Sequence, residues 1–244
     1  MGAAFGWGAL ASSSLVIGAV IAFLVRIPLR VIGLIMGFGA GVLISAVAFD
    51  LVEEAVGKSQ GEGWVAAGLF AGCLVFFAGD RLIAGLGSGG QRKDPDGSQE
   101  GDSPLAIVLG TVLDGIPESM VIGLTIFEGG AVGAAYLAAV FISNLPESVS
   151  ASSGLLAGGW SKSRVLGMWS GIALVSALSS MAGYGLFQDS SPGVVAFVLA
   201  FAGGAILTML ANTMMPEAFE HGGKLVGIVV TLGFAVAFTI HLLD

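Results

Sequence analysis

The sequence predicts an all-α integral membrane protein that crosses the bilayer eight times. Hydrophobic residues make up 55% of the 244 residues and charged residues only 11%, and the mean hydropathy is +0.95. A water-soluble domain needs more polar side chains than this to cover its surface. The apolar residues also occur in runs long enough to cross ~30 Å of hydrocarbon as helices. The 40 glycines suit closely packed membrane helices.

Each apolar stretch that is bounded by Gly, Pro or charged residues gives one predicted helix. The predicted spans are 9–26, 30–56, 64–86, 104–127, 131–157, 164–187, 193–217 and 223–243. Only the connection 87–103 is long and polar, and its Gly, Ser and Asp content predicts a flexible cytoplasmic loop between spans three and four. We therefore expect residues 1–244 to form a single membrane domain.

The basic residues indicate how the spans are oriented. Eight of the nine Lys and Arg residues fall in or beside alternate connections, and only Lys58 lies on the opposite side. The eight are Arg26, Arg30, Arg81, Arg92, Lys93, Lys162, Arg164 and Lys224. Because positively charged loops stay in the cytoplasm, this bias predicts that both termini are extracytoplasmic. We expect a multi-pass protein of the cell (plasma) membrane.

Short motifs repeat within the chain. Asp114-Gly-Ile-Pro-Glu-Ser119 in span four resembles Ser143-Asn-Leu-Pro-Glu-Ser148 in span five, and Phe49-Asp-Leu-Val-Glu-Glu-Ala55 in span two echoes Asn212-Thr-Met-Met-Pro-Glu-Ala218 in span seven. Spans 1–3 would then match spans 6–8, and span four would match span five. Matched spans cross in opposite directions, which predicts inverted repeats with a site near the repeat interface.

Spans four and five carry polar residues at spacings that place them on shared helix faces. Asp114 and Glu118 are four residues apart, and Asn144 and Glu147 are three apart. A carboxylate at membrane depth costs at least ~2.5–3.5 kcal/mol. Three carboxylates in two adjacent helices therefore need a cation, a proton or water beside them. We expect these four residues to form the site.

A proline precedes each of the two motif glutamates. Pro117 and Pro146 remove the helical hydrogen bonds to the carbonyl groups of Leu113 and Ile142 and bend their helices. A carbonyl released beside a carboxylate is a further oxygen ligand for a cation. A proline kink with a protonated glutamate is the structural alternative.

Other polar residues are candidates for a pathway toward and away from this site. Asp50 lies inside the outer end of span two and is the candidate for an entrance, whereas Glu53 can simply be solvated. At the end of span seven the acidic residues and His221 form either an exit site or an ordinary helix terminus. His241, near the outer end of the last span, is interpreted as an interface residue. The pathway candidates are Asp50, Glu53, Ser143, Glu217, Glu220 and His221.

With these motifs, the chain resembles the ZIP (zinc/iron permease) family of divalent-metal transporters. The resemblance covers nearly the whole chain and is carried by the two Pro-Glu motifs, 114–119 and 143–148. Gly39-Ala-Gly41 and Phe49-Asp-Leu51 of span two and Pro216-Glu-Ala218 of span seven look like further matches. The resemblance implies a metal site between spans four and five. It also implies transport into the cytoplasm by an elevator-like motion of one helix group.

The chain departs from the family pattern at the site itself. Asp114 stands where the family has histidine, Gly115 where it usually has asparagine, and Ser143 and Asn144 where its second motif commonly has His or Gln followed by an acid. Span six has no acid for a second metal, and the loop 87–103 has no histidine. Carboxylate and amide oxygens favour harder cations than imidazole does. We expect Zn²⁺ or a harder divalent cation such as Mn²⁺ as the substrate.

Three classes of function remain open at this point: a divalent-metal importer, a proton-coupled carrier of a non-metal solute on the same fold, and a membrane metal sensor that does not transport. No Ser-His-Asp set, HExxH motif or catalytic aspartate pair occurs, so we expect neither enzyme activity nor a resident cofactor. The expected partners are membrane lipid and the metal substrate, with a homodimer left open. Nucleic acid is not expected.

Overall fold

A computed structural model describes residues 1–243 of the chain except 60, 62, 85–103 and 128–133. Helices and short turns make up this part of the chain, and no strand occurs in it. Six of its helical runs are long and apolar enough to cross a membrane. The coarser form of the prediction is confirmed for the described residues, which are helical and include several helices long and apolar enough to span a membrane. The predicted loop 87–103 lies outside the described residues.

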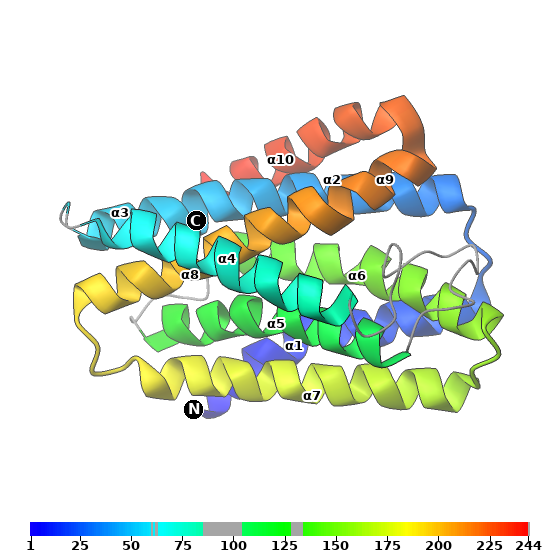
Figure 1. Ribbon diagram of the computed structural model, residues 1–244, viewed down its shortest axis with the longest axis horizontal. Coiled ribbons are helices and arrows are strands. Elements are labelled where there is room, and N and C mark those ends of the chain that lie inside the picture. The colour runs from blue at the N-terminus through cyan, green and yellow to red at the C-terminus, as the bar shows by residue number, and fades with distance from the viewer. Residues whose placement is uncertain (60, 62, 85–103, 128–133, 244) are drawn as a thin grey trace.

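The helices pack as two groups, of which one lies mainly above the other in the view of Figure 1. We call the upper set group A. It consists of α2 (Leu29–Ala46), the π-helix η1 (Val47–Glu53), α3 (Glu54–Ser59), α4 (Trp64–Ala84), α8 (Pro192–Met209), the π-helix η2 (Leu210–Met214), α9 (Met215–Gly222), the 3₁₀ turn η3 (Gly223–Leu225) and α10 (Val226–His241). We call the lower set group B, which consists of α1 (Gly2–Leu24), α5 (Pro104–Phe127), α6 (Ala134–Ala157) and α7 (Lys162–Leu186).

Group A is built from two closely packed helix pairs, α2 with α10 and α4 with α8. A Cβ atom at Gly41 of α2 would overlap the carbonyl oxygen of Val230 on α10, and one at Gly204 of α8 would overlap that of Leu69 on α4. Glycine at these positions lets the backbones touch, as small residues do in membrane helix pairs. The two pairs therefore use the same packing device.

Group B is joined by hydrogen bonds from small and aromatic side chains. Trp169 of α7 is fully buried and donates from Nε1 to Ser152 Oγ of α6 at 2.8 Å. Ser180 Oγ of α7 donates to the carbonyl oxygen of Ala4 on α1 at 2.8 Å. The buried hydroxyl and indole groups are thus satisfied between helices, as a low-dielectric interior requires.

Some helices begin and end at the predicted residues, and others do not. α5 begins at Pro104 and ends at Phe127, as predicted, whereas α1 begins at Gly2 rather than at residue 9. The apolar run Pro192–His241 reverses direction at Gly223, whose φ of 65° suits glycine, and α9 and α10 therefore form separate legs (Figure 1). α6 is not among the six apolar runs, because its serines, Asn144 and Glu147 lower its hydropathy.

Two π-helices interrupt group A, and the sequence did not predict either of them. η1 continues α2 and η2 continues α8. They overlap the first residues of the two segments that echo each other in sequence, 49–55 and 212–218. Short π-helical turns within α-helices are frequent at functional sites, because they redirect side chains. Here they precede α3 and α9, which both begin within these echo segments.

Candidate functional site

α5 places two carboxylates in the protein interior. Asp114 and Glu118 lie one turn apart and are 6% and 2% exposed. Pro117 lies between them inside the helix, as predicted. Tyr136 of α6 donates a hydrogen bond from its hydroxyl to the carbonyl oxygen of Glu118 at 3.4 Å. This bond links α6 to α5 beside the acidic residues.

α6 contributes the matching polar residues from the opposite motif. Ser143, Asn144 and Glu147 are all buried, and Pro146 lies inside the helix between them. A Cβ atom at Gly39 of α2 would be 3.2 Å from the Cα atom of Ser143, so glycine lets α2 approach α6 closely at this level. Group A therefore meets group B directly beside the second Pro-Glu motif.

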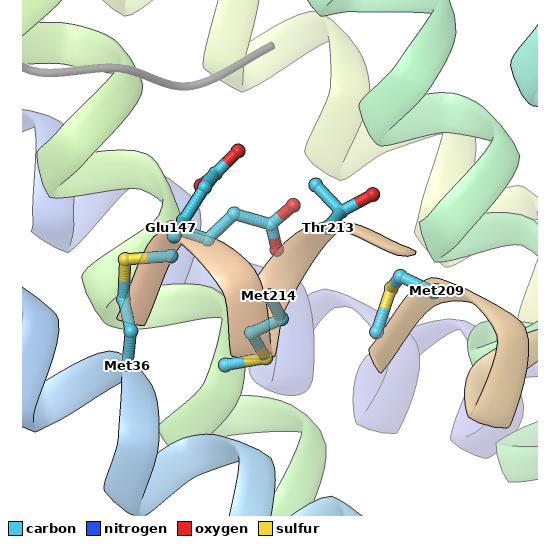
Figure 2. Close-up of a pocket in the computed structure, with 6 residues that line it drawn as sticks. Met36, Glu147, Met209, Thr213 and Met214 are labelled. Atoms are coloured by element: carbon cyan, nitrogen blue, oxygen red, sulfur yellow. The ribbon is translucent and has the colours of Figure 1, made fainter. Parts of the chain in front are cut away.

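A small cavity of about 10 Å³ lies at this meeting point. The residues that line it come from both groups: Met36, Glu147, Met209, Thr213, Met214 and Glu217. Figure 2 shows Glu147 with Met36, Met209, Thr213 and Met214 around this space. The volume corresponds to about one water molecule, so the cavity has room for one small ion rather than for an organic solute.

The four predicted ligands are all buried. The structure does not place their side chains together in the geometry of a metal site. No group of three or more His, Cys, Asp or Glu side chains is placed to hold a metal ion within the described part of the chain. Asp114, Glu118, Asn144 and Glu147 therefore remain a predicted ligand set. The structure adds a relation that was not predicted, which is the shared cavity of Glu147 and Glu217.

At the other end of α2, Asp50 has a partner that was interpreted differently from the sequence. His241 Nδ1 lies 2.7 Å from Asp50 Oδ1, with the side chains 31% and 14% exposed. The His241 ring also lies 5.5 Å from the Phe49 ring. His241 is thus a hydrogen-bond partner of Asp50, not only an interface residue. Glu53 is exposed at the surface, as a solvated residue would be.

The three candidate residues at the end of the seventh predicted span differ in burial. Glu217 is 2% exposed and lines the cavity, Glu220 is exposed, and His221 is half-buried. The His221 Cβ atom lies 2.9 Å from the position that a Cβ atom at Gly33 would take, so this end of α9 packs on the first turns of α2. Only Glu217 of the three faces the cavity.

Sequence reasoning missed Met36, Met209 and Thr213 as cavity residues and His241 as the partner of Asp50. A signal existed for two of them. Thr213 occupies the position in its echo segment that Asp50 occupies in the other. His241 is a lone imidazole in an apolar span, and polar side chains in such spans are usually paired with one another. Nothing in the sequence distinguishes Met36 or Met209 from packing residues.

Comparison of the chain with models of known protein families and with curated proteins gives no match. The likeness to the ZIP family therefore rests on the motifs of the two Pro-Glu helices and on the flanking residues of spans two and seven. The function must accordingly be argued from the site itself.

Proposed function

We propose that this protein is a ZIP-type importer of a divalent metal cation, Zn²⁺ or a harder ion such as Mn²⁺, with its site between α5 and α6. One observation carries the proposal: Asp114, Glu118 and Glu147 are buried on neighbouring helices beside two helix prolines. No enzyme activity and no resident cofactor form part of the proposal, and the metal is the substrate.

The energetic argument starts from the cost of burying charge. Each buried carboxylate costs at least ~2.5–3.5 kcal/mol at membrane depth. A divalent cation removes much of that cost for several carboxylates at once, and the carbonyl oxygens released by Pro117 and Pro146 are additional ligands for it. Asp114, Glu118, Asn144 and Glu147 supply only oxygen ligands, which both Zn²⁺ and Mn²⁺ accept.

The proposed architecture has eight spans arranged as inverted repeats. Two observations support it. The pair α2 and α10 and the pair α4 and α8 correspond to each other if spans 1–3 match spans 6–8. In addition, both π-helices overlap the matching echo segments, and each begins two residues before its segment. Groups A and B would then be the two bodies that move relative to each other, with the site in group B close to their contact.

In the proposed orientation, both termini lie on the extracytoplasmic side of the cell membrane. Lys162 at the start of α7 donates from Nζ to the carbonyl oxygen of Phe23 at the end of α1, at 3.3 Å. This contact brings Lys162 to the same end of the molecule as Arg26, which lies in the connection from α1 to α2, and Arg30, which lies at the start of α2. A single basic end supports the positive-inside assignment of that end to the cytoplasm.

A proton-coupled carrier of a non-metal solute is the second candidate. It is favoured by the lack of any three-residue metal group among the described residues. Buried carboxylates that share protons would satisfy the same energetic requirement. A non-transporting metal sensor would bind metal at the same residues without flux.

The test is metal uptake by the purified full-length protein in proteoliposomes that contain a metal-sensitive dye. Wild-type protein should accumulate Zn²⁺ or Mn²⁺, and Glu118→Ala or Glu147→Ala should abolish uptake. Asp189→Asn is the control, because Asp189 is exposed in the connection before α8. Wild-type uptake in both glutamate variants would contradict the proposal. A pH-driven flux that persists in strong chelator would favour the proton-coupled carrier.

A further inference from the structure

Positive charge gathers where the connection from α1 to α2 meets the connection from α6 to α7. Both connections lie at the right-hand end of the molecule in Figure 1. The only charged side chains in residues 1–49 and 148–188 are Arg26, Arg30, Lys162 and Arg164. All four are exposed. We call Arg26, Lys162 and Arg164 the basic corner. Its local excess of cations contrasts with the formal net charge of −8 of the whole chain.

Lys162 is held against the end of α1. Its Nζ atom donates to the carbonyl oxygen of Phe23 at 3.3 Å and lies 5.7 Å from the centre of the Phe23 ring. A cation at this distance is attracted to the face of the ring. An ammonium group has three donors, so Lys162 can still donate to a further acceptor. Arg26 follows three residues after Phe23, and its Cα atom is therefore within about 11 Å of that of Phe23.

Arg164 is placed by the connection from α6 to α7. Its guanidinium carbon lies over the Trp160 ring, 5.1 Å from the ring centre, and its backbone N–H donates to Ser161 Oγ at 3.3 Å. A guanidinium group carries five N–H donors in one plane, which suits two oxygens of a phosphate group. Within the part of the chain that the structure describes, no carboxylate forms an ion pair with the basic corner.

The basic corner lies where two apolar helices end. α1 and α7 are both long and apolar enough to cross a membrane, and α1 ends at Leu24 whereas α7 begins at Lys162. The half-buried Trp160 ring is at the same level, and tryptophan is enriched at the boundary between membrane and water. Phosphate groups of phospholipids lie at this boundary, and cations placed there attract anionic headgroups.

We propose that the basic corner binds the phosphate of an anionic phospholipid. Lys162 and Arg164 supply the donors for the phosphate oxygens, and Arg26 adds a third positive charge. The contacts with Phe23 and Trp160 hold two of the cations in place before the lipid binds, which lowers the entropy that binding costs. The site contains none of the predicted metal ligands, so it does not depend on the proposed function.

The test is native mass spectrometry of the purified full-length protein, titrated in detergent with phosphatidylglycerol or with phosphatidylcholine. Wild-type protein should bind the anionic lipid about tenfold more tightly than the zwitterionic one, equivalent to ~1.4 kcal/mol. Lys162→Gln and Arg164→Gln should each weaken binding of phosphatidylglycerol about fivefold, equivalent to ~1 kcal/mol. Binding of phosphatidylcholine should not change. Arg164→Lys keeps the charge without the planar group and should lose less affinity than Arg164→Gln.

Lys58→Gln is the matched control, because Lys58 lies in α3 near the opposite end of the molecule and pairs with Glu54 at 3.6 Å. It should leave the affinity for phosphatidylglycerol unchanged. Equal affinity of the wild-type protein for the two lipids would overturn the proposal, and so would full affinity for phosphatidylglycerol in the double variant Lys162→Gln/Arg164→Gln. Displacement of the lipid by an equal concentration of inorganic phosphate would assign the corner to a soluble anion instead.

Discussion

His241 Nδ1 of α10 lies 2.7 Å from Asp50 Oδ1 in the π-helix η1. This contact joins the last turn of α10 to η1, the π-helix that continues α2. Phe49, next to Asp50, packs its ring 4.8 Å from that of Phe238 and 5.5 Å from that of His241. The hydrogen bond and the aromatic contacts together hold the C-terminal end of α10 against η1.

Removing either member of this pair should destabilise the protein. Hydrogen bonds that involve charged groups contribute about 1.5–3 kcal/mol when shielded, and partial exposure lowers this to about 1 kcal/mol. Asp50→Asn and His241→Gln should each lower the unfolding midpoint in detergent. The double variant should lose no more than the larger single loss, because the two residues share one interaction. Fully additive losses would show that the pair does not interact.

The close backbone contacts in group A predict opposite effects for similar glycine substitutions. Gly41→Ala and Gly204→Ala should each destabilise the protein by about 1–3 kcal/mol, because the new methyl group overlaps a carbonyl oxygen on the neighbouring helix. Gly57→Ala in α3 has open space around the added methyl group and should stabilise that helix by about 1 kcal/mol. Thermal unfolding of the three variants checks the prediction, and equal effects at all three positions would contradict it.

The bond from Trp169 to Ser152 should be important for the packing of α7 on α6. Ser152→Ala leaves the buried indole N–H without its acceptor and should cost about 1–3 kcal/mol of stability. Ser179→Ala is the matched control on α7, because the exposed Ser179 hydroxyl bonds only to the carbonyl oxygen of Val175, four residues earlier in the same helix. A Ser152 variant as stable as the control would mean that the indole finds another acceptor.

The two prolines should lower stability and support transport. Pro117→Ala and Pro146→Ala restore helical hydrogen bonds that the prolines remove, so each variant should be more stable by up to about 3 kcal/mol. The same change withdraws carbonyl oxygens from the cation, and uptake should fall about tenfold, equivalent to ~1.4 kcal/mol. Unfolding midpoints and proteoliposome uptake, measured on the same preparations, test both signs. Unchanged uptake would show that the released carbonyl groups play no part in transport.

Helix positions could be predicted from the sequence where apolar runs end at prolines or charges. Pro104 and Phe127 mark the ends of α5 as expected, and the motif carboxylates Asp114 and Glu118 lie one turn apart on that helix as their spacing predicted. These features are local, because hydropathy and residue spacing along one helix determine them.

The remaining features depend on contacts between distant segments. The π-helix η1 contains no proline and no glycine that would indicate a break in the helical pattern. The bond between Asp50 and His241 joins residues 191 positions apart, and Glu217 lines the same cavity as Glu147, which lies on a helix distant in sequence. The residue spacing within one helix predicts which polar residues share a helix face. It does not predict which helix faces pack against each other.

The position of a bound metal ion tests the proposed function most directly. Crystals of the full-length protein, soaked with Zn²⁺ and measured at the zinc absorption edge, should show an anomalous peak between α5 and α6. That peak should lie about 2.0–2.2 Å from carboxylate oxygens of Glu118 and Glu147, which is the normal zinc–oxygen distance. A saturating soak that leaves the space between these two glutamates without anomalous density would contradict a metal site at the two Pro-Glu motifs.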